Sequence, residues 1–239
     1  MMRLFRGLHI AVAEYDATCA VLRTAGQPLN GPWGQSQFVR LPQERDKLLA
    51  DPQLARARIT DSSDMAGICA CGDEAGSALY AWPDKPKLSH LPVVAEIQVD
   101  PHRVIVDGRD FLYTAFGQWD QENNRNSDKL TAFLERIYGR AVLKYWQKAA
   151  DSSSLDYRYA LSDLAVTDPE VVASHYANNL PFRGRYATRF CSAFIIEGPI
   201  LPSEVLDVRL AEPSRRHDKW STFDAMKLIN RREEADPLP

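Results

Sequence analysis

Residues 92–100 constrain the fold most strongly, because their apolar side chains recur at every second position. The two alternating sets are Val93, Ala95, Ile97 and Val99 on one side and Val94, Glu96 and Gln98 on the other. Successive side chains of a strand point to opposite faces of a sheet, so this alternation predicts a half-buried β-strand. A strand of this kind needs partner strands to satisfy its backbone hydrogen bonds.

Further segments predict both strands and helices. Strands are expected at residues 4–10, 67–72, 104–106, 190–196 and 205–208. Helices are expected from residue 15 to the stop at Gly26, and over residues 42–58, 73–82, 128–148 and 169–178. The segment 128–148 carries the clearest helical spacing of apolar residues, with Ser127 available as its N-cap. The mixture predicts an α+β fold.

Length and composition favour one globular domain. The chain has 239 residues, 45% of them hydrophobic and 26% charged, with a formal net charge of −3. We expect a single domain over residues 1–239, with a helical insertion at about 118–180 and a polar tail at about 213–239. The net charge provides no overall attraction to nucleic acid or to an anionic membrane, so a polyanion would have to meet a local basic patch.

Cysteine spacing and hydropathy exclude several classes of protein. Cys19, Cys69, Cys71 and Cys191 form no Cys-x-x-Cys pair and have no histidine at zinc-finger spacing. We therefore predict neither a disulfide framework nor a metal site. No apolar run is long enough to span a membrane, so the expected location is the cytoplasm of the producing cell or of a cell that receives the protein as an effector.

The first strand carries three residues suited to ligand binding. Arg6 and His9 offer donors to phosphate or ribose oxygens, and Gly7 lets a ligand approach the backbone closely. The alternative is an edge strand with solvated polar side chains.

A second motif lies in residues 67–82, where a Gly-rich strand end leads into a helical turn. Tyr80 could present a flat ring to a planar group, with Ser77 one turn earlier on the same side. The alternative is that the aromatic residues of this turn fill the core.

Together with residues 190–208, these segments resemble the ADP-ribosyltransferase superfamily, and most closely the DarT-type toxins. The resemblance rests on the order of four short matches: Phe5-Arg6-Gly7-Leu8-His9, then Ala55-Arg56-Ala57-Arg58, then Leu79-Tyr80-Ala81, then Ala193-Phe194-Ile195-Ile196 before Pro199. Arg6 stands where DarT-type toxins have histidine and where arginine-type members have arginine, which leaves the subgroup open. The fold implied is a split β-sandwich of short strands with flanking helices.

The resemblance also implies a substrate and a set of site residues. NAD would be the substrate, with nicotinamide beside the Tyr80 region and an arginine of the basic segment near the reacting ribose. The implied catalytic positions are Ala193 and Arg58. The implied NAD-contacting residues are Arg6, Gly7, Leu8, His9, Arg56, Ser77 and Tyr80.

Ala193 occupies the position where the family carries its catalytic glutamate. Cleavage of the bond between nicotinamide and ribose develops positive charge on the sugar, which a carboxylate stabilises and an alanine does not. Either a Glu→Ala change at this position disarmed a toxic enzyme, or the chain is a natural pseudoenzyme that binds without catalysing. An unrelated α+β interaction protein is a third reading, in which the site residues would not converge.

The macromolecular acceptor is the least constrained element. DarT-type relatives modify bases in nucleic acid, which suits the arginines if they gather on one face; these are Arg56, Arg58, Arg183, Arg185 and Arg189. The negative net charge keeps a protein acceptor open. For a toxin, the further partner expected is an antitoxin or immunity protein, and no membrane partner is expected.

Overall fold

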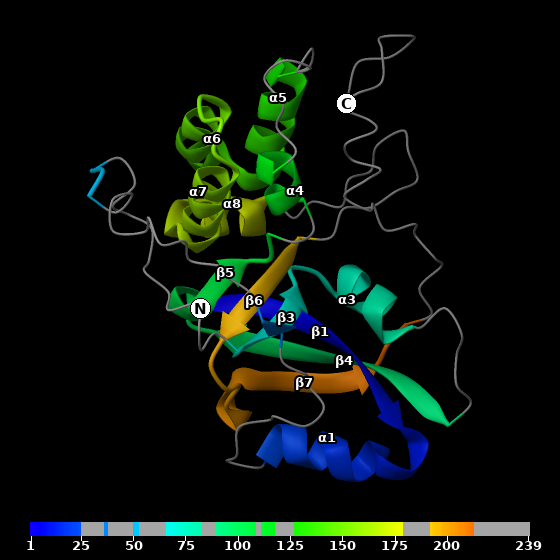
Figure 1. Ribbon diagram of the computed structural model, residues 1–239. Helices are drawn as coiled ribbons and strands as arrows, with labels where there is room; N and C mark the ends of the chain where they lie inside the picture. The colour runs from blue at the N-terminus through cyan, green and yellow to red at the C-terminus, as the bar shows by residue number, and fades with distance from the viewer. Residues whose placement is uncertain are drawn as a thin grey trace, which may run out of the picture. The chain divides into compact units, whose positions relative to one another are not determined.

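The computed structural model describes residues 1–24, 36–37, 50–52, 66–82, 89–108, 111–117, 127–178 and 192–212 (Figure 1). The chain divides into two compact units. The sheet unit comprises residues 1–38, 65–104 and 191–217, and the helical unit comprises residues 39–64, 105–190 and 218–239. The predicted helix at 42–58 lies almost wholly outside the described residues, and the predicted tail at 213–239 lies entirely outside them.

The strands form one sheet in the order β5-β6-β3-β1-β4-β7, with β2 pairing beside β3. Their bounds are β1 Met2–Ala11, β2 Ser36–Gln37, β3 Ala66–Cys71, β4 His90–Val99, β5 Val104–Val106, β6 Ala193–Glu197 and β7 Val205–Leu210. All the pairings with a described register are antiparallel. Helices and an antiparallel sheet together confirm the predicted α+β class.

Among the strand pairings with a described register, the one between β1 and β3 is the shortest. Strand β1 pairs with β4 along its whole length, from Met2 opposite Val99 to Ala11 opposite His90. Strand β1 pairs with β3 at a single position, Phe5 opposite Cys71. The sheet therefore consists of two well-paired parts joined at a narrow place between β1 and β3.

Two helices belong to the sheet unit: α1 Tyr15–Thr24, which runs alongside β7, and α3 Glu74–Ala81 (Figure 1). Short 3-10 turns also occur at η1 Val12–Glu14, η2 Pro101–Arg103 and η4 Pro202–Glu204. Helix α3 begins at its cap Asp73, whose carboxylate accepts a hydrogen bond from the Gly76 N–H. This cap confirms the turn predicted over residues 73–82.

Strand β4 is buried on both faces, which corrects the half-buried prediction. Residues 93–97 are all buried, including Val94 and Glu96 on the face that we expected to meet solvent. Val94 packs in a cluster with Phe5 and with Ala78 and Ala81 of α3. A helix thus covers the second face of the strand, and the period of the sequence alone did not reveal it.

Arg103 fixes the connection between β6 and β7. Its Nε donates to the Glu197 carbonyl at 3.0 Å, and a second guanidinium nitrogen donates to the Pro199 carbonyl. Its Nη1 lies 2.5 Å from Glu204 Oε1, while Glu204 Oε2 accepts from the Leu201 N–H at 2.8 Å. A charged clamp therefore holds the connection that follows β6.

The helical unit contains five helices among the residues described (Figure 1). They are α4 Leu112–Gly117, α5 Ser127–Tyr138, α6 Leu143–Ala150, α7 Leu155–Thr167 and α8 Pro169–Ala177, with a 3-10 turn η3 Arg140–Val142. Helix α8 confirms the helix predicted at 169–178. Helices α4 and α7 had no counterpart among the predictions.

The prediction of one continuous helix over residues 128–148 is wrong, because α5 ends before Gly139 and α6 begins after it. Gly139 has a φ of 76°, in the left-handed region that ends a helix, and its N–H donates to the Glu135 carbonyl at 2.8 Å. A Cβ at this position would lie 2.3 Å from the Ser174 Cβ, so the close packing of α8 also requires glycine. The apolar spacing continued across the break and concealed it.

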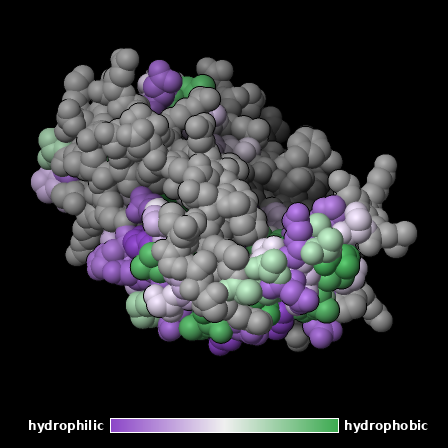
Figure 2. Space-filling view, turned by 90° about the horizontal axis from the view of Figure 1, so that it is seen from below, coloured by the Kyte–Doolittle hydropathy of each residue, from purple (hydrophilic) through white to green (hydrophobic). Residues whose placement is uncertain are grey.

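On the face seen in Figure 2, hydrophobic and hydrophilic residues of the described part are interspersed. Exposed leucines occur singly on the sheet unit, for example Leu206 and Leu210 of β7. Scattered exposed apolar residues of this kind are common on folded domains and need no partner to explain them.

His175 is buried inside the helical unit. We expect it to make the stability of this unit depend on pH. Its ring stacks on Tyr138 with 4.8 Å between centroids, and its Nδ1 lies 3.2 Å from the Ile137 carbonyl. Burial lowers its pKa to about 4, against a hydrogen bond to the Ile137 carbonyl and the charge of Asp107, which both raise the pKa. The folded state thus resists protonation that the unfolded chain accepts below about pH 6.5.

We expect this contribution to be fully present above about pH 6.5 and to fall by about 1.4 kcal/mol per pH unit until the pH reaches the folded pKa. Urea unfolding followed by circular dichroism at pH 7, 5.5 and 4.5 measures the loss. His175→Phe keeps a ring against Tyr138 and should flatten this part of the pH dependence. An unchanged slope in His175→Phe would contradict the assignment.

Candidate functional site

The structure describes seven of the nine site residues predicted from the sequence. Arg56 and Arg58 lie outside the described residues. The others are Arg6, Gly7, Leu8 and His9 on β1, Ser77 and Tyr80 on α3, and Ala193 at the start of β6.

Arg6 lies at the narrow junction of the sheet. It directly follows Phe5, the β1 residue that pairs with β3, and its side chain is half-buried. Its Nη1 donates to the Cys69 carbonyl of β3 at 2.7 Å. A guanidinium, rather than further backbone pairing, thus links β1 to β3 next to Phe5. Guanidinium groups of this kind are suited to binding phosphate or ribose oxygens.

Gly7 is explained by helix packing. A Cβ on Gly7 would lie 2.0 Å from the Ser77 carbonyl oxygen and 2.8 Å from the Ala81 nitrogen. The group that approaches the Gly7 backbone is therefore α3, which corrects the expectation that a ligand does so on this side. The sequence motif was compatible with close packing of a helix and with close approach of a ligand.

Leu8 and Ser77 are core residues in this structure. Leu8 is 4% exposed and Ser77 is 0% exposed. The Ser77 hydroxyl donates to the Glu74 carbonyl at 2.8 Å, within its own helix. Neither side chain can reach a ligand in this arrangement, which corrects their implied roles as NAD contacts.

Tyr80 and His9 are exposed. Tyr80 is 46% exposed, so its ring does not fill the core, whereas Trp82 of the same turn packs against the core cluster, as the alternative expected. His9 is exposed on β1, and its ring lies 6.2 Å from that of His90 on β4, centroid to centroid. Both side chains are accessible to a ligand.

Ala193 does not share a face of the sheet with Arg6. Ala193 pairs opposite Cys71, which pairs opposite Phe5, and directly paired residues project to the same face. Arg6 follows Phe5 in the same strand and so projects to the other face. Ala193 is also 7% exposed. The register therefore places the side chains of Arg6 and Ala193 on opposite faces of the sheet, contrary to the expectation that they converge.

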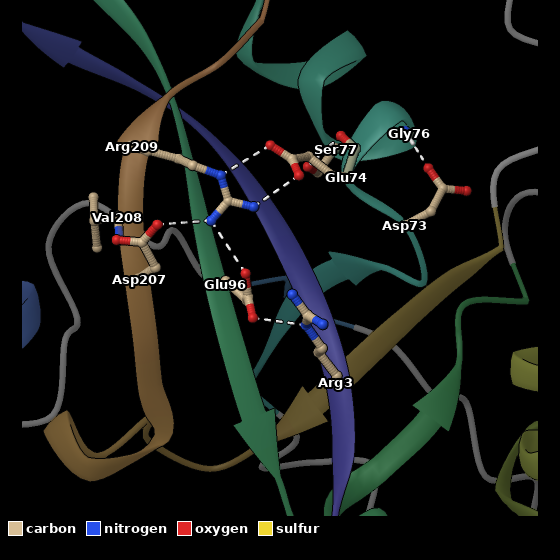
Figure 3. A network of polar contacts seen from close by, with 9 residues as sticks. All are labelled: Arg3, Asp73, Glu74, Gly76, Ser77, Glu96, Asp207, Val208 and Arg209. Atoms are coloured by element: carbon tan, nitrogen blue, oxygen red, sulfur yellow. Dashed lines mark hydrogen bonds and ion pairs between the residues drawn. The ribbon is translucent and has the colours of Figure 1, made fainter.

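The largest polar cluster among the described residues was not predicted from the sequence (Figure 3). Arg209 of β7 lies at its centre. Its Nε and Nη2 donate to the two carboxylate oxygens of Glu74 at 3.0 and 2.7 Å. Its Nη1 donates to Glu96 at 3.1 Å and to Asp207 at 2.9 Å. Arg3 Nε lies 2.6 Å from the other Glu96 oxygen.

This Arg209 cluster favours the ionised form of Glu96. The hydrogen bond from Arg3 lowers the pKa of Glu96, with Arg209 acting in the same direction against burial. The hydrogen bond that Arg209 donates to Glu74 raises the pKa of Arg209. Because Glu74 belongs to the first turn of α3, the cluster anchors that helix to β4 and β7. The far end of α3 is anchored by Trp82, whose Nε1 donates to the Glu212 carbonyl at 3.0 Å.

The cluster can therefore fix α3 and the exposed Tyr80 ring on it, but its acids are poorly placed to exchange protons with a substrate. The bidentate contact to Glu74 is the strong form of an arginine–carboxylate pair. Glu96 gave the one available sequence signal, a charged residue inside an otherwise apolar strand. Its partners, Arg3 and Arg209, lie in segments far from Glu96 in the sequence. Local spacing therefore could not reveal them.

Within the described ranges, no helix is long and apolar enough to span a membrane, and no three His, Cys, Asp or Glu side chains gather as metal ligands. Comparison of the chain with protein-family models, with curated proteins and with solved structures gave no match.

Proposed function

We propose that this chain is an ADP-ribosyltransferase-like protein that binds NAD at the junction between β1 and β3, and that Ala193 occupies its catalytic acid position. The observation that carries the proposal is the single paired position between these strands, bridged by Arg6 to the Cys69 carbonyl. A sheet in two parts with an arginine at the join is what a split β-sandwich with an NAD-binding first strand requires.

Each described group has a role in this proposal. Arg6 donates to the phosphates or ribose of NAD from the junction of the sheet. Helix α3 packs on the opposite face of β1, the face of Phe5 and Gly7. Tyr80 offers its exposed ring to the nicotinamide on that face, which is also the face of His9 and Ala193.

The Arg209 cluster holds α3, and hence Tyr80, in a fixed orientation. Glu74 and Glu96 do not replace the missing carboxylate, since both are bound to Arg209.

With a glutamate at position 193, the reaction would transfer ADP-ribose from NAD to a macromolecule and release nicotinamide. We favour nucleic acid over protein as the acceptor. The protein would then act as a toxin in the cytoplasm, restrained by an antitoxin or immunity protein. The arginines of 183–189 that suit this acceptor lie outside the described residues. Two described lysines are engaged by acids, Lys144 with Asp168 and Lys148 with Asp51.

Two observations favour a second function, that of an α+β interaction protein with no nucleotide site. Arg6 and Ala193 project to opposite faces of the sheet, and Ser77 is buried. In that reading, Arg6 has a structural role and links β1 to the Cys69 carbonyl of β3.

A calorimetric titration of the untagged chain with NAD distinguishes the NAD-binding protein from the interaction protein. The proposal expects saturable one-site binding that weakens by about tenfold or more in Arg6→Gln, since a hydrogen bond to a charged group is worth about 1.5–3 kcal/mol. Arg140→Gln is the control, because Arg140 is an exposed arginine of the helical unit that takes no part in the proposed site. Absence of saturable binding, or equal losses in both variants, would favour the interaction protein.

A further inference from the structure

Two histidines from distant parts of the sequence lie on one face of the sheet. His9 of β1 pairs opposite Pro92, and His90 of β4 pairs opposite Ala11. The two histidines are thus diagonal neighbours on adjacent antiparallel strands, and they project to the same face. Their ring centroids are 6.2 Å apart, with the planes tilted by 46°. His9 is exposed and His90 is half-buried.

This separation allows both rings to bind one ion. A zinc–imidazole bond is about 2.0–2.1 Å long, so two nitrogens on one ion lie at most about 4 Å apart. Rings with centroids 6.2 Å apart can meet this requirement by small rotations of their side chains. The backbone beneath them is fixed, because the β1–β4 ladder continues to a bond from the Val12 N–H to the Ser89 carbonyl at 2.8 Å.

Ser89 orients the His90 ring in the way that metal-binding histidines are commonly oriented. Its Oγ lies 3.0 Å from His90 Nδ1. When Nδ1 carries the proton and donates to Ser89, Nε2 has the lone pair that a metal ion needs. Metal binding would therefore select this tautomer.

We propose that His9 and His90 bind one divalent first-row transition metal ion, with Zn²⁺ as the representative, through one nitrogen each. Neutral imidazole suits ions of this class. The described residues supply two ligands, so water or a group from a bound molecule completes the coordination, and the affinity is that of an open site rather than of a closed structural one. The site stands independently of NAD binding.

The test is a calorimetric titration of the untagged, reduced chain with ZnCl₂. We expect one equivalent to bind, with affinity reduced by about tenfold or more in His9→Ala and in His90→Ala, and by a smaller factor in Ser89→Ala. His102→Ala is the matched control, because His102 is an exposed histidine of the same unit outside the His9–His90 pair, and this variant should bind as the unaltered chain does.

Circular dichroism of each variant establishes that the fold is kept. Binding that is unchanged in both His9→Ala and His90→Ala, or no binding by the unaltered chain, would overturn the proposal. A loss in only one of the two variants would also overturn it, since both rings are required to hold the ion.

Discussion

Gly7→Ala should lower the free energy of unfolding of the sheet unit by about 3 kcal/mol, because overpacking costs about 1–3 kcal/mol and more where backbone must move. The new Cβ would lie 2.0 Å from the Ser77 carbonyl oxygen and 2.8 Å from the Ala81 nitrogen. Both are backbone atoms of α3, so no rotamer change can relieve the clash. The helix must shift away from β1, against its anchors at Arg209 and Glu212.

Denaturant unfolding of the purified chain measures this loss. Gly67→Ala is the matched control, because its Cβ would clash with a side-chain atom, the Ile195 Cγ2 at 2.1 Å, while the nearest backbone atom, the Ile196 oxygen, lies 3.4 Å away. We expect Gly67→Ala to cost clearly less than Gly7→Ala. If Gly7→Ala were as stable as the unaltered chain, helix packing would not explain this glycine, and close approach of a ligand would again be the better explanation.

The strands could be predicted from the sequence because their signals are local. Alternation over residues 92–100 and the short apolar runs at 67–72 and 205–208 correspond to β4, β3 and β7. Each signal lies within a few residues and needs no knowledge of the neighbours. The α+β class followed directly from combining these strands with the helical segments.

The break at Gly139 shows where a local pattern fails. Apolar residues keep helical spacing on both sides of it, and both flanking segments are helices. The break depends on the positive φ of Gly139 and on the close approach of Ser174, a residue 35 positions later. Glycine gave the signal, but the packing partner decided its meaning.

The faces of the sheet depend on register, which the sequence did not provide. Arg6 and Ala193 appeared compatible with one site because the order of motifs along the chain matched a family. The pairings of Phe5 with Cys71 and of Cys71 with Ala193 determine the faces, and they separate the two side chains. The pairs Arg209–Glu96 and His9–His90 were missed for the same reason, since each joins segments far apart in the sequence.

Ala193→Glu should restore NAD cleavage by a factor of about 10²–10⁴, the usual contribution of a positioned acid or base. A carboxylate at this position would stabilise positive charge on the ribose as nicotinamide leaves. Ala193 is 7% exposed, so the new carboxyl would be partly desolvated, and burial of this kind raises a carboxyl pKa. The restored activity should therefore increase as the pH rises through that pKa.

Release of nicotinamide from NAD by Ala193→Glu, measured beside the unaltered chain, tests the central claim most directly. Ser192→Glu is the control, because Ser192 is a buried neighbour at which the resemblance places no acid. The account predicts release by Ala193→Glu at least about a hundredfold faster than by the unaltered chain, with no gain in Ser192→Glu. A folded Ala193→Glu protein that releases nicotinamide no faster than the unaltered chain would contradict the assignment of Ala193 as the vacant acid position.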